Sequence, residues 1–200
     1  DIHLDTVEVD PKVAQVAKQF FHVKETPKHK IHFSDGRQFL RLNKTRKYDA
    51  ILMDAYTSNQ FGTHIPFHLA TKEFFRLAAE DLTEEGVLVF NVIGTYDDWR
   101  SDIVGSMYQT LKSVFPNVYH FQASDTRNIV MLAVKSKEPL TSTTLKNKVA
   151  ALRAARPKLP KSFGPRVARI RAQAPKSAAN AGVLTDDFAP PGGLLKSKKR

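Results

Sequence analysis

The sequence of 200 residues contains no cysteine and only one tryptophan. Without cysteine, the chain has no disulfides, no thiolate nucleophile and no cysteine-ligated zinc, and we expect a reducing, cytoplasmic location. No stretch approaches the ~18 uncharged apolar residues that a membrane span needs, so we predict that this chain does not cross a bilayer. The first residue is Asp1 rather than Met, and no charged-then-apolar leader follows it. We therefore expect a processed or cut piece of a longer protein.

Acidic residues are scarce in the last third of the chain, which explains the net charge of +11. Residues 141–200 hold 14 Lys and Arg but only Asp186 and Asp187 as acids, a net of +12, so residues 1–140 carry a net of −1. We favour a solvated, partly disordered extension over a site for nucleic acid, an anionic surface or an acidic subunit. Only Phe163 and Phe188 interrupt it with aromatic rings, which argues against stacking on single-stranded nucleic acid.

Strand and helix patterns alternate along the first two thirds. Asp10-Pro11 opens the first helix, with Asp10 as its N-cap. The apolar run that ends at Asp54 is typical of a parallel strand buried on both faces. These patterns predict an α/β domain over residues 1–138 and a basic extension over residues 139–200. The expected strands are 4–9, 30–33, 48–54, 86–92, 118–122 and 128–134, the last two antiparallel, and the expected helices begin at 11, 37, 66 and 97, with one more over 141–153.

Three acids lie at or just after successive strand ends: Glu8, Asp35 and Asp54. In open parallel sheets, ligands bind beyond the carboxyl ends of the strands. A carboxylate there can accept hydrogen bonds from a ribose diol or an adenine amino group. One such acid would more often be a helix N-cap, as Asp10 is, but three in succession favour a ligand site.

Several motifs resemble the spermidine synthase family, the polyamine aminopropyltransferases. They are VEVDPKVAQVAKQFF, DGRQFL, YDAILMDAY, GVLVFNV and the helix ending in VFP. The resemblance covers residues 4–135 and 183–190, and IPFHLATKEFF with LTDDFAP is similar to a spermidine-synthase-like branch, some of whose members are fused to transporter domains. It implies a Rossmann-like class I methyltransferase sheet, mainly parallel with a C-terminal antiparallel hairpin, and a homo-oligomer.

The same resemblance implies roles for single residues. Glu8 would hold the ribose, while Asp35 would contact the adenine amino group, with Gly36 allowing close approach. Asp54 would deprotonate the attacking amine. The co-substrate would be decarboxylated S-adenosylmethionine, the acceptor putrescine or a related polyamine, and no metal would be needed.

The loop after Asp54 offers further candidates. Tyr56 can contact substrate or only shape the turn, and Gln60 and His64 can line an amine pocket. His64 and His68 are four residues apart, but no third ligand accompanies them, so we expect no metal site. Outside this loop, Asn91, Trp99 and the Asp186-Asp187 pair each have a packing or capping interpretation beside a functional one.

Two departures from the family pattern limit how far the family's residue roles apply to this chain. The second acid of the family's D-S-x-D-P loop is absent, because Asp54 is followed by Ala-Tyr-Thr-Ser. The chain also starts after the family's first strand and its Gly-rich turn; in the strand order 3-2-1-4-5-7-6 that strand is central. We expect the natural protein to extend N-terminally; otherwise it is a divergent form that cannot bind the co-substrate normally.

Three functions therefore stay open. The leading hypothesis is an aminopropyltransferase. A methyltransferase on the same fold, using S-adenosylmethionine itself, is the second. A non-catalytic module that binds a nucleoside or a polyanion is the third, favoured by the incomplete loop and the basic extension.

Overall fold

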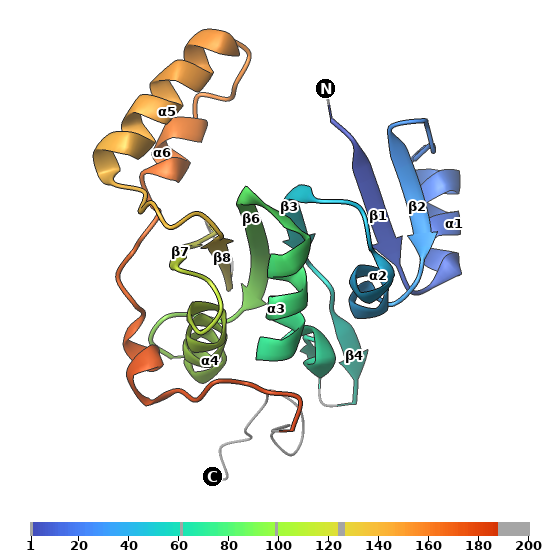
Figure 1. Cartoon of the computed structure of the whole chain (residues 1–200), viewed down its shortest axis with the longest axis horizontal. Helices are drawn as coiled ribbons and strands as arrows, with labels where there is room; N and C mark the ends of the chain where they lie inside the picture. The colour runs from blue at the N-terminus through green and yellow to red at the C-terminus, as the bar shows by residue number, and fades with distance from the viewer. Residues whose placement is uncertain (1, 61, 99, 124–126, 188–200) are drawn as a thin grey trace. The chain divides into compact units, whose positions relative to one another are not determined.

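The computed structural model describes residues 2–60, 62–98, 100–123 and 127–187. The chain divides into two compact units, Asp1–Arg46 (unit 1) and Lys47–Arg200 (unit 2). Figure 1 shows the elements of each unit. Within the described residues, no helix is long and apolar enough to cross a membrane.

Unit 1 contains two parallel strands, each followed by a helix. The elements are β1 (Leu4–Glu8), α1 (Pro11–Phe20), β2 (His29–Phe33) and α2 (Gly36–Leu42). Asp10 caps α1 as predicted, accepting a hydrogen bond from the Lys12 amide. Because the register pairs Glu8 with Phe33, both strands end at the same edge of the sheet.

Unit 2 is built on a four-stranded sheet. Its strands are β3 (Tyr48–Met53), β6 (Leu82–Ile93), β7 (Asn117–Gln122) and β8 (Asn128–Val134), in the order β3-β6-β8-β7. β3 and β6 are parallel, whereas β8 is antiparallel to both β6 and β7. The order corresponds to strands 4-5-7-6 of the predicted fold, and the β1-β2 pair corresponds to strands 2-3. The predicted α/β class with a C-terminal antiparallel hairpin is therefore confirmed.

Helices α3 (Lys72–Asp81) and α4 (Ser101–Lys112) pack against the unit 2 sheet (Figure 1). Phe75 of α3 is fully buried and meets Phe90 of β6 edge-on, with ring centroids 5.7 Å apart. The helix expected from residue 66 begins later, after the short η1 turn (Phe67–Leu69), because Thr71 caps α3. The polar loop expected over 55–65 contains a small hairpin of β4 (Thr57–Asn59) and β5 (Gly62–His64).

The C-terminal part of the chain has two different portions. Helices α5 (Ser142–Ala155) and α6 (Phe163–Val167) form a pair without buried side chains, the orange helices of Figure 1. Residues 170–187 instead lie on unit 2, with η2 (Lys176–Asn180) against α4. Here Leu184 is buried, and its amide donates to Thr110 Oγ1 at 2.9 Å. We call residues 170–187 the C-terminal strap. Residues 170–187 therefore differ from the expected solvated extension, whereas α5 and α6 bury no side chain.

Candidate functional site

Glu8 and Asp35 share the carboxyl edge of the unit 1 sheet. The Ser34 amide donates to the Glu8 carbonyl at 3.2 Å, which joins the two strand ends. The Glu8 carboxylate accepts from the Asp10 amide at 2.8 Å, so the turn into α1 fixes its side chain. Both acids are half-buried. The structure therefore brings these two predicted residues to one edge.

Asp35 is also the N-cap of α2. Its Oδ1 atom accepts from the amides of Arg37 and Gln38, each at 3.0 Å. The cap interpretation weighed for a single acid thus applies to Asp35, as it does to Asp10. Gly36 begins the helix directly after it. The structure therefore shows a capping role for Asp35.

Asp54 directly follows β3, as predicted, and Asn91 of β6 orients it. The Asn91 amide nitrogen donates to Asp54 Oδ1 at 2.8 Å. The Asn91 backbone carbonyl in turn accepts from the Tyr56 hydroxyl at 2.5 Å. Asp54 stays exposed, whereas Tyr56 is half-buried. Asn91, which had both a capping and a functional interpretation, therefore orients the carboxylate of Asp54, the predicted base.

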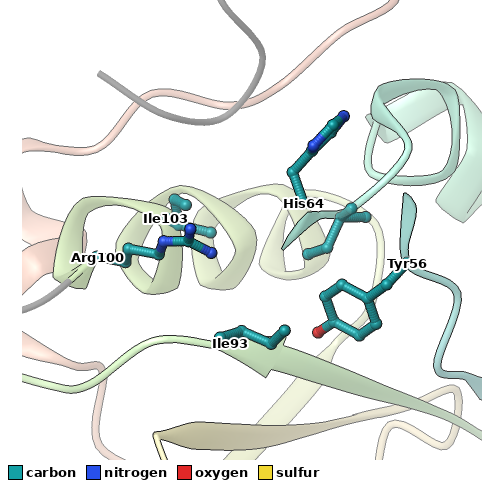
Figure 2. Close-up of a pocket in the computed structure, with 6 residues that line it drawn as sticks. Tyr56, His64, Ile93, Arg100 and Ile103 are labelled. Carbon is teal, nitrogen blue, oxygen red and sulfur yellow. The ribbon is translucent and has the colours of Figure 1, made fainter. Parts of the chain in front are cut away.

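A small open hollow with a cavity volume of about 10 Å³ lies beside this group. Figure 2 shows the Arg100 guanidinium and the Tyr56 hydroxyl pointing into the same space, whereas the imidazole of His64 extends away from it. Gln60 is exposed and does not belong to the pocket wall. The wall consists of Tyr56, His64, Ile65, Ile93, Arg100 and Ile103.

The electrostatics keep Tyr56 protonated. Burial raises the pKa of the Tyr56 phenol, and the Asp54 charge adds to the effect, while the charge of Arg100 opposes it. A phenol with a raised pKa remains a hydrogen-bond donor at neutral pH. The Tyr56 hydroxyl therefore donates to the Asn91 carbonyl, and the residue also forms one side of the pocket.

Arg100 is the charged wall residue that the sequence patterns did not predict. It precedes α4 in a left-handed conformation, with φ of 55°, and its Nη1 donates to the Thr63 carbonyl of β5 at 3.0 Å. Thr63 is distant in sequence, and no local motif marks the arginine. The preceding residue, Trp99, lies outside the described residues.

The other sequence candidates lie elsewhere or form no metal centre. The Asp186 amide donates to the Glu73 carboxylate in the first turn of α3 at 3.0 Å, so this part of LTDDFAP attaches the C-terminal strap. His68 belongs to the η1 turn. Within the described parts of the chain, no group of three or more His, Asp or Glu is arranged to hold a metal ion.

The fold and the strand-end acids define a class I methyltransferase-like domain. Human methyltransferase-like protein 13, solved in complex with SAH, aligns with a TM-score of 0.67 at 24% identity, over 80% of this chain and 75% of that one. A probable spermidine synthase from Corynebacterium glutamicum ATCC 13032 aligns with a TM-score of 0.58 at 23% identity, over 74% of this chain and 53% of that one. At these identities the likeness shows a shared fold.

The sequence comparisons narrow the class to a family. The model of the spermine/spermidine synthase domain matches residues 2–145. The chain belongs to the spermine/spermidine synthase family. The polyamine aminopropyltransferase of Vibrio vulnificus (strain CMCP6) is 34% identical over 140 residues, which cover 68% of this chain and 44% of that protein. The chain thus spans less than half the length of this curated relative.

Proposed function

We propose that the protein transfers an aminopropyl group from decarboxylated S-adenosylmethionine to an amine, for which the family resemblance implies putrescine or a related polyamine. Membership of the spermine/spermidine synthase family supports the reaction class. The observation that carries the proposal is Asp54, held at the end of β3 by the Asn91 amide beside the pocket. A cytoplasmic location remains part of this proposal.

The proposed step needs a base because the acceptor is protonated at neutral pH. An alkylamine has a pKa of ~10, like that of lysine, so its lone pair is mostly occupied by a proton. Asp54 attracts the ammonium and accepts the proton. The nitrogen then attacks the carbon next to the sulfonium, the C–S bond breaks with its electrons going to sulfur, and methylthioadenosine leaves. The Asn91 amide keeps the carboxylate of Asp54 oriented during this transfer.

Glu8 and Asp35 would hold the nucleoside of the donor. Carboxylates suit the ribose hydroxyls and the adenine amino group, because each of these groups donates hydrogen bonds. Both acids are fixed by neighbouring backbone amides. Gly36 adds no side chain at the start of α2, where a base would approach.

The test is a product assay with matched variants. The complete protein is incubated with putrescine and each sulfonium donor, and nucleoside products are identified by mass spectrometry. We expect methylthioadenosine, reduced at least about a hundredfold in Asp54→Asn because general-base catalysis contributes roughly that much or more. Methylthioadenosine binding should persist in the variant. Equal activity of Asp54→Asn would contradict the proposal.

A methyltransferase is the second candidate. The fold shared with a methyltransferase-like protein supports it, whereas the missing second loop acid favours the non-catalytic module. S-adenosylhomocysteine as the product, formed from S-adenosylmethionine, would replace the first proposal with this one. Nucleoside binding without either product would favour the non-catalytic module.

A further inference from the structure

Helices α5 and α6 form a pair that lacks a core of its own. Neither helix buries a side chain. Arg153 Nη2 of α5 donates to the Lys161 carbonyl, which precedes α6, at 2.9 Å. A Cβ added at Gly164 of α6 would lie 3.7 Å from Val149 Cγ1, so the two helices approach closely at this point. Most of the remaining surface of the pair faces solvent and is open to a partner.

The surface of this pair carries charge of one sign. Residues 142–167 contain seven Lys and Arg and no Asp or Glu. The nearest acids along the chain are Glu138 and Asp186, so the pair supplies no carboxylate to neutralise its cations. All seven basic side chains are exposed: Lys146, Lys148, Arg153, Arg156, Lys158, Lys161 and Arg166.

Such a surface favours a partner with many negative charges. A solvated helix normally mixes both signs, because Glu and Lys four residues apart stabilise it. In the α5–α6 pair the cations repel one another instead, and a polyanion would remove that repulsion. Composition alone favours a solvated extension over residues 139–200. The two helices change this interpretation, because they hold the cations on a folded scaffold.

The apolar residues of the pair indicate which polyanion fits. A helix at a membrane surface inserts a broad apolar face, whereas α5 directs Val149 toward α6. Proteins that bind single strands stack the bases on aromatic rings. Phe163 is the one aromatic residue in the sequence of 142–167, and it is half-buried. The phosphate backbone of a duplex needs neither feature, only cations spaced along a surface.

Helix α5 is long enough to follow such a backbone. Its 14 residues span about 21 Å at a rise of about 1.5 Å per residue. Lys146 and Arg153 are seven residues apart, so they lie on the same side of α5 and about 10 Å apart along its axis. We propose that the α5–α6 pair binds the phosphate backbone of double-stranded nucleic acid, without regard to base sequence. This inference is independent of the proposed function, because the strand-end site uses none of these cations.

The test measures binding of the full chain to a short, fluorescently labelled duplex, as DNA and as RNA, by anisotropy. One variant combines Lys146→Gln, Lys148→Gln and Lys158→Gln; glutamine keeps α5 helical, because its helix propensity is close to that of lysine. At about 0.1 M salt this triple variant should bind at least about tenfold more weakly. The slope of log affinity against log salt should become shallower by up to about 3, roughly one for each lost phosphate contact.

The matched control combines Lys12→Gln, Lys24→Gln and Lys44→Gln. These lysines are exposed in unit 1, and their loss changes the net charge by the same amount. The control should bind the duplex as the unaltered chain does. Equal weakening in both triple variants would mean that binding follows net charge, and it would overturn the inference. So would full binding by the α5–α6 variant.

A second variant separates loss of charge from loss of structure. Arginine in place of Lys146, Lys148 and Lys158 keeps the charge and should keep the affinity within about threefold. If this variant bound as weakly as the glutamine variant, the cations would not be the binding groups and the inference would be wrong. Circular dichroism of each variant measures whether its helices are retained.

Other polyanions compete with the duplex in the same assay. Vesicles of anionic phospholipid, a single strand of the same sequence and polyglutamate each carry negative charge without a duplex. Tighter binding to any of these three than to both duplexes would overturn the inference. Binding to either duplex above the three supports it, and the tighter of the two identifies DNA or RNA as the source of the phosphates.

Discussion

The two units of the chain differ sharply in how much apolar surface they bury. In unit 2, the helices and the sheet enclose fully buried aromatic side chains such as Phe74 and Phe75. In the described residues of unit 1, only Ala14 and Leu40 reach comparable burial. Larger side chains of unit 1, including Phe20 and Phe33, stay exposed.

This difference indicates that the two units are stabilised by different kinds of interaction. A unit of 46 residues buries a smaller share of its surface than a larger domain does. Unit 1 is therefore organised mainly by local interactions, namely helix caps and the β1-β2 register. Unit 2 has a core of its own, so its stability should respond to substitutions that unit 1 tolerates.

The largest effect is expected in a matched pair of phenylalanines. Phe75→Ala removes a side chain with 0% exposure and should cost about 3–5 kcal/mol of unfolding free energy. Phe20→Ala, at 63% exposure, should change it by no more than about 0.5 kcal/mol. Urea unfolding of both variants measures the difference. Similar losses of unfolding free energy in the two variants would show that Phe20 is buried in solution. The difference in burial between the two units would then be wrong.

Much of the fold was predictable because its signals are local. The Asp10-Pro11 pair starts α1 as expected, and the apolar run before Asp54 forms the parallel strand β3. The β4-β5 hairpin was missed, because its polar residues show no apolar alternation. The predicted helix begins at Asp97, because aspartate is a common N-cap residue. The structure instead begins α4 at Ser101, after Arg100 in a left-handed conformation that no sequence pattern marks.

The candidate site was predictable at the residues that the strand ends position. Glu8 and Asp35 share an edge because parallel strands end together. The support of Asp54 by Asn91 links residues 37 positions apart, and only the pairing of β3 with β6 brings them together. Arg100 joins the pocket by a tertiary contact with Thr63. Such contacts depend on packing, which periodicity and spacing do not encode.

The next largest effect tests how closely the C-terminal strap packs on unit 2. Alanine normally stabilises a helix interior by about 1 kcal/mol relative to glycine. A Cβ on Gly105 of α4 would lie 2.5 Å from the Ser177 carbonyl oxygen. Because backbone must move to relieve that contact, Gly105→Ala should lose about 1–3 kcal/mol instead. Denaturant unfolding gives the sign directly.

Gly164→Ala is the control for this prediction. Its added Cβ would meet only ordinary contacts, the nearest being Arg153 side-chain atoms at 3.7 Å. It should therefore be neutral or slightly stabilising. If Gly105→Ala behaved in the same way, the strap would not be held against α4 in solution.

A smaller effect distinguishes capping from ligand binding in unit 1. Asp10→Ala and Asp35→Ala each remove a helix N-cap and should each cost about 1 kcal/mol. Only Asp35→Ala should also weaken methylthioadenosine binding, by about tenfold, through the loss of one charge-assisted hydrogen bond to the adenine amino group. Calorimetric titration measures this affinity.

Asp35→Asn completes that comparison. Asparagine caps helices about as well as aspartate, so α2 should keep its stability. The neutral amide should bind the nucleoside more weakly than the carboxylate does. The contrary result is that both Asp35 variants bind methylthioadenosine as tightly as Asp10→Ala does. In that case Asp35 would only cap α2, and the proposal that it holds the nucleoside of the donor would be wrong.

The smallest effect concerns pH and a buried histidine of unit 2. His120 of β7 is 1% exposed; its Nε2 donates to the Gln173 carbonyl, so Nδ1 accepts from the Tyr96 hydroxyl. Burial lowers the pKa of His120 below its ordinary value of 6.5; the bond to Gln173 opposes this, and the charge of Arg171 lowers the pKa further. The unfolded chain therefore takes up the proton first as pH falls.

The contribution of neutral His120 to stability should be complete above about pH 6.5 and should be lost as the pH falls below that value toward the lowered pKa. Unfolding free energies measured from pH 8 to pH 5 should therefore decline more steeply in the unaltered chain than in His120→Gln. Glutamine can still donate to the Gln173 carbonyl but cannot take up a proton in this range. Parallel pH profiles would mean that His120 is exposed to solvent in solution. They would also mean that residues 171–173 do not pack against β7.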